Sequence, residues 1–127
     1  MVKTALLSVD LERGREVLEA LDRANIKVSV ALWAYLSEYE DWRLIVSGRQ
    51  FDSAGVGNAY KMLNDSLDSA GMAIEIAPVV MILPMTDIFI KGLRRMFAKS
   101  RNVDGMRLGG QLFGDRFVED GVAYRIG

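Results

Sequence analysis

The chain has 127 residues, of which half are apolar and 26% are charged, with a formal net charge of −1 and neither histidine nor cysteine. This composition is typical of a globular protein, and it excludes a disulfide framework, an ordinary zinc site and catalysis of the Ser-His-Asp or Cys-His type. The near-neutral charge gives the whole molecule no attraction to nucleic acid or membranes. No apolar run approaches the roughly 20 residues of a membrane helix. We therefore expect one domain over residues 1–127, located in the cytoplasm.

The first half of the chain predicts a helix, a hairpin and a second helix. Apolar residues recur at helical spacing over Val9–Ala24, and again over residues 54–70, where Gly71 is suited to end the helix. Between them, residues 27–36 alternate like a strand. A short acidic turn connects this strand to a second one over residues 42–47, so the pair is predicted to be an antiparallel hairpin.

The second half predicts a strand, a helix and a closing hairpin. A strand is expected over residues 74–83, most clearly from Val79 onward, because Pro78 cannot donate to a ladder. Thr86 or Asp87 is suited to cap a third helix. That helix is expected over residues 88–99, and the closing strands over residues 106–113 and 117–126, joined around Gly114 and Asp115.

The predicted order is α-β-β-α-β-α-β-β, and the fold class is α+β. Two hairpins require antiparallel neighbours, and two strand-helix-strand crossovers favour parallel neighbours. We expect a mixed five-stranded sheet packed with three helices.

Charge is divided unevenly along the chain. Residues 1–87 hold thirteen acids and eight bases, whereas residues 88–127 hold four acids and eight bases. Five cations fall within a stretch that has no acid: Lys91, Arg94, Arg95, Lys99 and Arg101. On a helix, positions 91, 95 and 99 would lie on one face. This stretch is the best candidate surface for an anion, a nucleic acid or an acidic partner, and the alternative is an ordinary solvated face.

The acidic turn of the first hairpin could hold a divalent cation. Glu38, Glu40 and Asp41 supply the oxygen ligands that Mg²⁺ prefers. A metal-dependent nuclease would also need an Asp/Glu-x-Lys segment, which the chain lacks; Asp41-Trp42-Arg43 is the nearest approach. The alternative is a solvated turn whose charges discourage strand pairing with other molecules.

A glycine segment and an aromatic cluster are two further candidates. Gly55-Val56-Gly57 could present backbone N–H groups to a phosphate, but Tyr60 takes the place of the third glycine of a dinucleotide fingerprint. Aromatic residues crowd the first hairpin, and Trp33, Tyr35 and Trp42 are candidates either for cross-strand packing or for an interface.

The hairpin segment Ala31-Leu32-Trp33, followed by residues 38–47, resembles a group of small, uncharacterised bacterial α/β proteins. So do residues 11–15, residues 57–60 and the closing residues 119–125. The resemblance covers most of the chain, and it implies no activity, cofactor or site residue.

We expect a binding or protein-interaction module rather than an enzyme, without a cofactor or metal and with a homo-oligomeric or other protein partner. Two alternatives remain open. One is binding of nucleic acid or another anion through residues 88–101, and the other is a Mg²⁺-dependent phosphoryl hydrolase that uses the acidic turn.

Overall fold

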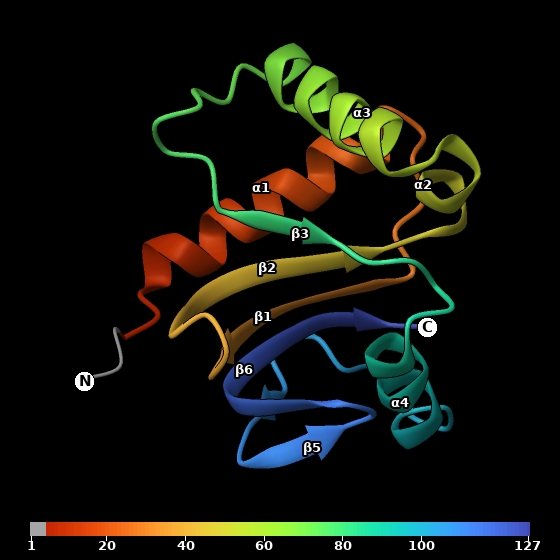
Figure 1. Ribbon diagram of the computed structural model, residues 1–127. Helices are drawn as coiled ribbons and strands as arrows, with labels where there is room; N and C mark the ends of the chain where they lie inside the picture. The colour runs from red at the N-terminus through yellow and green to blue at the C-terminus, as the bar shows by residue number, and fades with distance from the viewer. Residues whose placement is uncertain (1–4) are drawn as a thin grey trace.

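The computed structural model describes residues 5–127, so residues 1–4 of the predicted domain lie outside the described part. A mixed sheet carries α1, α2 and α3 on one face and α4 on the other (Figure 1). The elements are α1 (Ser8–Arg23), β1 (Val30–Leu36), β2 (Asp41–Ser47), α2 (Arg49–Ala54), α3 (Val56–Ser69), β3 (Val80–Ile82), α4 (Ile88–Met96), β4 (Arg107–Leu108), β5 (Gln111–Phe113) and β6 (Arg116–Ile126).

The α+β class, the mixed sheet and the predicted order are confirmed, with two additions. The loop expected before the second helix contains the short helix α2, which Gly55 separates from α3 with a positive φ of 86°. The first strand of the closing hairpin is divided into β4 and β5 at Gly109 and Gly110. Within residues 5–127 there are therefore four helices and six strands.

The strand order is β3-β2-β1-β6-β4. The sixth strand, β5, also pairs with β6 and stands outside this linear order. β1 and β2 form the predicted antiparallel hairpin, in which Val30 lies opposite Ser47. β3 runs parallel to β2, as the crossover through α2 and α3 predicts. β6 pairs antiparallel with β1, so the carboxyl ends of β2, β3 and β6 lie at the same end of the sheet.

Two sequence-based expectations are wrong. The crossover through α4 does not give parallel neighbours, because β3 and β4 lie at opposite edges of the sheet and β4 pairs antiparallel with β6. The strand expected from residue 74 begins only at Val80. Residues 73–77 form turns closed by backbone hydrogen bonds from Ile76 to Ala73 and from Ala77 to Ile74.

Alternate residues of the central strands pack into two cores, one on each face of the sheet. Trp33, Leu44 and Val46 face α1 and α3, whereas Leu32 and Ile45 face α4. Because both faces are covered, all seven residues of β1 are buried.

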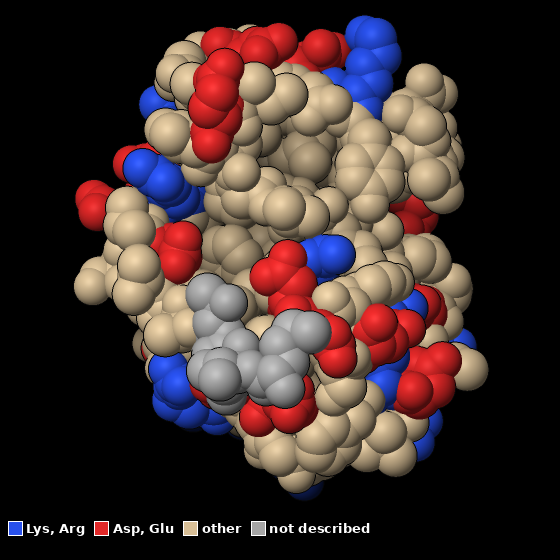
Figure 2. Space-filling view, turned by 60° about the vertical axis from the view of Figure 1, so that its left-hand side comes forward, with Lys and Arg blue, Asp and Glu red and all other residues tan. Residues whose placement is uncertain are grey.

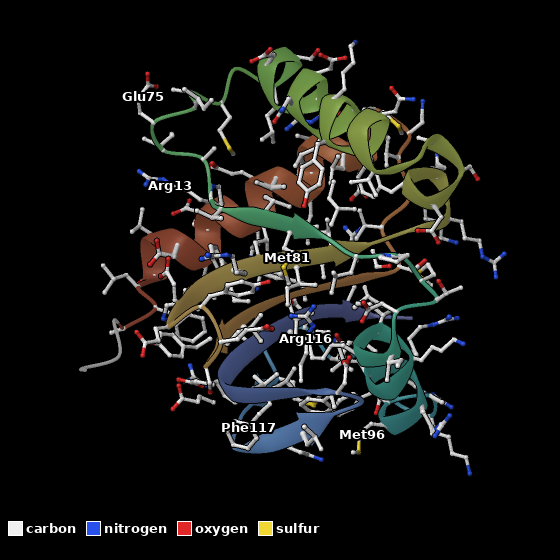
Figure 3. The ribbon with its side chains drawn as sticks, in the orientation of Figure 1. Arg13, Glu75, Met81, Met96, Arg116 and Phe117 are labelled. Atoms are coloured by element: carbon white, nitrogen blue, oxygen red, sulfur yellow. The ribbon has the colours of Figure 1, made fainter. Side chains whose placement is uncertain are left out.

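Some apolar side chains remain on the surface. Met96 and Phe117, labelled in Figure 3, are exposed near the hairpin of β5 and β6. Ile74, Ile76 and Val79 are exposed in the segment that leads to β3. Figure 2 brings that side of the molecule forward and shows a hollowed, largely uncharged area with charged side chains around it. No helix within residues 5–127 is both long enough and apolar enough to span a membrane.

Candidate functional site

The five predicted basic residues do not share one helix, because α4 ends at Met96. Lys91 and Arg95 are exposed on α4, and Lys99 and Arg101 are exposed in the turns that follow it. The expected alignment of residues 91, 95 and 99 on one helix face is therefore wrong for Lys99. The C-cap of the helix is Phe97, which packs against the core on the α4 side.

Arg94 is placed differently from the other four. It is half-buried, and its Nε donates to the backbone oxygen of Gly127 at 2.8 Å. This hydrogen bond directs the guanidinium toward the end of the sheet where β6 finishes and β1 begins.

A cavity of about 350 Å³, which we call the basic cavity, opens at this end of the sheet. Its charged side chains are Lys27, Arg49 and Arg94, which come from the loop before β1, the first residue of α2 and the last turn of α4. No Asp or Glu lines this cavity. The remaining lining residues are Ser29, Gln50, Met85 and Gly127.

Hydrogen bonds to the backbone hold the residues of the basic cavity in place. Gln50 Oε1 accepts from the backbone N–H of Lys27 at 2.6 Å, and Gln50 Nε2 donates to the carbonyl of Asn25 at 2.8 Å. The Gly127 N–H donates to the Ser29 carbonyl at 2.9 Å, which extends the pairing of β1 with β6. The two cations at positions 27 and 49 therefore project from hydrogen-bonded backbone rather than from a loose loop.

The charge of the basic cavity is uncompensated by acidic side chains. Six other cations of the described chain are paired: Arg15 with Asp104, Arg43 with Asp41, Lys61 with Asp65, Arg107 with Asp120, Arg116 with Glu38 and Arg125 with Asp22. The ion pairs within residues 5–127 include neither Lys27 nor Arg49 nor Arg94. Uncompensated like charges around a concave surface attract an anion more strongly than isolated surface charges do.

An adjoining cavity of about 270 Å³ shares Ser29 and Gly127 with the basic cavity. It brings in the predicted residue Arg101, together with Arg125. Lys91, Arg95 and Lys99 line neither of the two cavities.

The acidic side chains of the turn are not brought together as ligands for one metal ion. Glu38 forms an ion pair with Arg116, which is labelled in Figure 3, and Asp41 pairs with Arg43 at 3.0 Å. Asp41 also accepts from the backbone N–H of the next residue at 2.8 Å. Within residues 5–127 no three acidic side chains lie close enough to hold one ion. This arrangement gives the hydrolase hypothesis no support.

The glycine segment at the start of α3 borders an apolar space rather than a basic one. Gly55 lies beside Val56 in a cleft between α2, α3 and β3. The phosphate hypothesis for this segment therefore lacks a cationic partner among the residues that line the cleft.

The three candidate interface aromatics belong to the core. Trp33, Tyr35 and Trp42 expose 5%, 5% and 7% of their surface. Tyr35 and Trp42 are cross-strand neighbours that meet edge to face, with ring centroids 5.6 Å apart. Their side chains are not on the surface of the single chain, so we assign them to packing, and the homo-oligomer stays a prediction.

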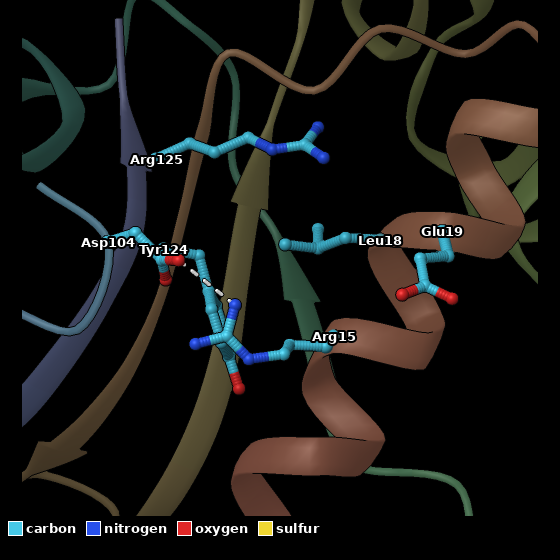
Figure 4. Close-up of a pocket in the computed structure, with 6 residues that line it drawn as sticks. All are labelled: Arg15, Leu18, Glu19, Asp104, Tyr124 and Arg125. Atoms are coloured by element: carbon cyan, nitrogen blue, oxygen red, sulfur yellow. Dashed lines mark hydrogen bonds and ion pairs between the residues drawn. The ribbon is translucent and has the colours of Figure 1, made fainter. Parts of the chain in front are cut away.

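A polar pocket between α1 and β6 is shown in Figure 4. Arg15 pairs with Asp104 at 3.1 Å, and its guanidinium lies 5.3 Å from the ring centroid of Tyr124. The Tyr124 hydroxyl accepts from Trp33 Nε1 at 3.1 Å and donates to the Leu11 carbonyl at 2.6 Å. Burial raises the pKa of Tyr124, although the hydrogen bond from the indole opposes this shift. Because Arg15 contacts both Asp104 and Tyr124, and Tyr124 hydrogen-bonds to Trp33 and Leu11, we interpret these residues as a structural link between α1 and the sheet.

Comparison with protein-family models, with curated proteins and with solved structures finds no match for the chain. The resemblance to small bacterial proteins therefore stays a prediction. The roles of the site residues rest on their geometry alone.

Sequence reasoning missed Lys27 and Arg49. The hairpin register could have indicated that these two residues lie close together. Residue 30 pairs with residue 47, and continuing this register beyond the strands places residue 27 opposite residue 50, next to Arg49. Arg94 and Gly127 join them only through the pairing of β6 with β1, which the local pattern does not encode.

Proposed function

We propose that this chain is a binding module that takes up a phosphate-bearing small molecule in the basic cavity. The observation that supports this function is the meeting of Lys27, Arg49 and Arg94 in one concavity with no acidic side chain in its lining. A volume of about 350 Å³ falls within the range of roughly 300–1,000 Å³ that is usual for small-molecule sites.

The residue types suit a phosphoryl group. An arginine carries five N–H donors in a planar fork that matches phosphate oxygens, whereas a lysine acts as a compact point charge. The contact with Gly127 uses the Nε donor of Arg94 and leaves both Nη groups to face a ligand. Ser29 adds a hydroxyl donor to the same wall. Charge-assisted hydrogen bonds of this kind are about twice as strong as neutral ones.

Nucleic acid fits this arrangement less well. Phosphates along a nucleic acid need cations spread over an extended surface, and single strands also need exposed aromatic rings for stacking. Lys91, Arg95 and Lys99 provide exposed charge, but they lie outside the basic cavity. A small phosphorylated ligand is therefore the better fit, and a titration can distinguish it from an oligonucleotide.

The test is a calorimetric titration with inorganic pyrophosphate at low ionic strength, repeated on the variants Arg49→Gln and Arg94→Gln. Each substitution removes one fork of donors, so we expect the dissociation constant to rise about tenfold or more in each variant. Arg95→Gln is the matched control, because it removes the neighbouring charge on α4 from outside the cavity and should change the affinity by less than about twofold.

Two results would overturn the proposal. One is the absence of binding heat at low ionic strength with the unmodified chain. The other is an equal loss of affinity in Arg94→Gln and Arg95→Gln, accompanied by tighter binding of a short oligonucleotide than of pyrophosphate, which would favour a nucleic-acid surface.

A further inference from the structure

An apolar cleft also borders α2, and its lining shares no residue with that of the basic cavity. It has a volume of about 310 Å³ and is lined by residues of α2, the start of α3, β3 and the segment that leads to α4. Figure 1 shows where these elements lie in the fold. Its walls are formed mainly by Phe51, Val56, Ala59, Ile82 and Pro84. Phe51 and Ala59 are buried, whereas Val56 exposes 77% of its surface, so Val56 lies at the mouth of the cleft.

Only one charged side chain lines this cleft, and it is acidic. The carboxylate of Asp52 accepts from the backbone N–H of Met85, with Oδ2 at 3.1 Å. The ion pairs within residues 5–127 do not include Asp52. The apolar cleft therefore carries an uncompensated negative charge at its wall.

Tyr60 adds a second polar group and an aromatic ring. Its hydroxyl accepts from the backbone N–H of Ile82 at 2.9 Å, which leaves the phenolic hydrogen for another acceptor. This bond also covers one donor at the open edge of β3, so the ring is held against the strand. An aromatic face beside a carboxylate favours a cation over an anion.

We propose that the apolar cleft binds a small amine with an apolar body, whose ammonium group is held by Asp52. The apolar walls would bury the body of the ligand, and Asp52 would select its positive end. This charge preference is opposite to that of the basic cavity. The two proposals therefore rest on different residues and can fail independently.

The experiment compares two ligands that share a ring and differ in the sign of their charge, 2-phenylethylamine and 3-phenylpropanoate. Binding is followed by amide chemical shifts of the isotope-labelled chain. The amine should bind about tenfold or more tightly than the carboxylate, because only the amine forms a charge-assisted contact with Asp52. The perturbed amides should belong to α2, the first turn of α3 and residues 82–86.

Three variants separate the contributions. Asp52→Asn keeps an oxygen acceptor for the Met85 N–H and removes the charge, so the preference for the amine should fall to about twofold or less. Asp68→Asn removes an exposed acid of α3 outside the cleft and should leave the preference unchanged. Val56→Phe at the exposed mouth should weaken both ligands by obstructing entry, without disturbing the core.

Equal affinity for the two ligands would overturn the proposal, and so would an amine preference that survives Asp52→Asn. Absence of amine binding up to roughly 10 mM, a weak limit for a ligand of this size, would also overturn it. Equal binding that is insensitive to position 52 would indicate a cleft for an uncharged apolar group instead.

Discussion

At the scale of single residues, the effect of a buried serine hydroxyl on stability depends on whether its position offers a hydrogen-bond partner. Two serines within residues 5–127 are buried, and their hydroxyl groups differ in hydrogen bonding. Ser66 Oγ donates to the Met62 carbonyl at 2.7 Å. Ser47, with 0% exposure at the end of β2, has a hydroxyl with no hydrogen-bond partner among the described residues. A buried hydroxyl without a partner loses its hydration and gains nothing in return.

Ser47→Ala should therefore stabilise the protein. Removing the unpaired hydroxyl is expected to raise the free energy of unfolding by about 1 kcal/mol, measured by urea denaturation. Ser66→Ala is the matched substitution at the satisfied serine, and it should give no comparable gain. A loss of stability in Ser47→Ala would show that the hydroxyl is paired in solution.

At the scale of elements, α1 docks on the sheet through its one glycine. A Cβ on Gly14 would lie 2.8 Å from Nε1 of Trp33 and closer still to the hydroxyl of Tyr124. Helix propensity alone indicates only that a glycine at this position weakens the helix. The structure shows that it makes room for the side chains that hydrogen-bond beneath α1.

Gly14→Ala should thus destabilise the protein even though alanine is the better helix former. Intrinsic propensity favours alanine by about 1 kcal/mol, but the overlap with buried side chains should reverse the sign and give a net loss of about 1 kcal/mol or more. Gly57→Ala tests propensity alone, because a Cβ in that first turn of α3 meets no atom within 4 Å. Thermal unfolding should show a lower melting temperature for Gly14→Ala and an equal or higher one for Gly57→Ala.

Elements whose apolar residues repeat regularly over many positions could be predicted from the sequence. Elements whose bounds depend on tertiary contacts could not. α1 and α3 bury regular stripes, and the hairpin of β1 and β2 alternates clearly, so their order and pairing can be read from the sequence. α2 has six residues and one buried side chain, Phe51, which is too little for a periodic signal. β3 is shorter than its apolar stretch because only residues near Val80 reach the edge of β2.

At the scale of the whole molecule, the candidate site depends on long-range pairing. The sequence identified a cationic stretch around α4, and one of its five residues, Arg94, lines the basic cavity. Its partners at positions 27 and 49 lie more than forty residues earlier in the chain. They meet Arg94 because β6 returns beside β1 and brings Gly127 next to Ser29. No local pattern predicts that return, so the location of the cavity could not be derived from composition or spacing.

The stability of the whole molecule should fall at alkaline pH through Tyr124. Burial holds its pKa above the ordinary value of 10.0, so the folded state keeps a proton that the unfolded state releases at lower pH. The contribution of this tyrosine to stability is therefore complete below the unfolded pKa, near pH 10, and is lost as the pH rises through the folded pKa. Urea denaturation between about pH 8 and pH 11 should show a falling free energy of unfolding in the unmodified chain.

Tyr124→Phe separates this proton linkage from the hydrogen bonds. The variant should be less stable at pH 8 by about 1–3 kcal/mol, because the indole of Trp33 loses its acceptor and the Leu11 carbonyl loses its donor. Its stability should then decline less steeply above pH 10 than that of the unmodified chain. Tyr39→Phe, at an exposed tyrosine of the hairpin turn, should keep the original slope. An unchanged slope in Tyr124→Phe would show that the alkaline loss arises elsewhere, and that the bond between α1 and β6 carries no proton linkage.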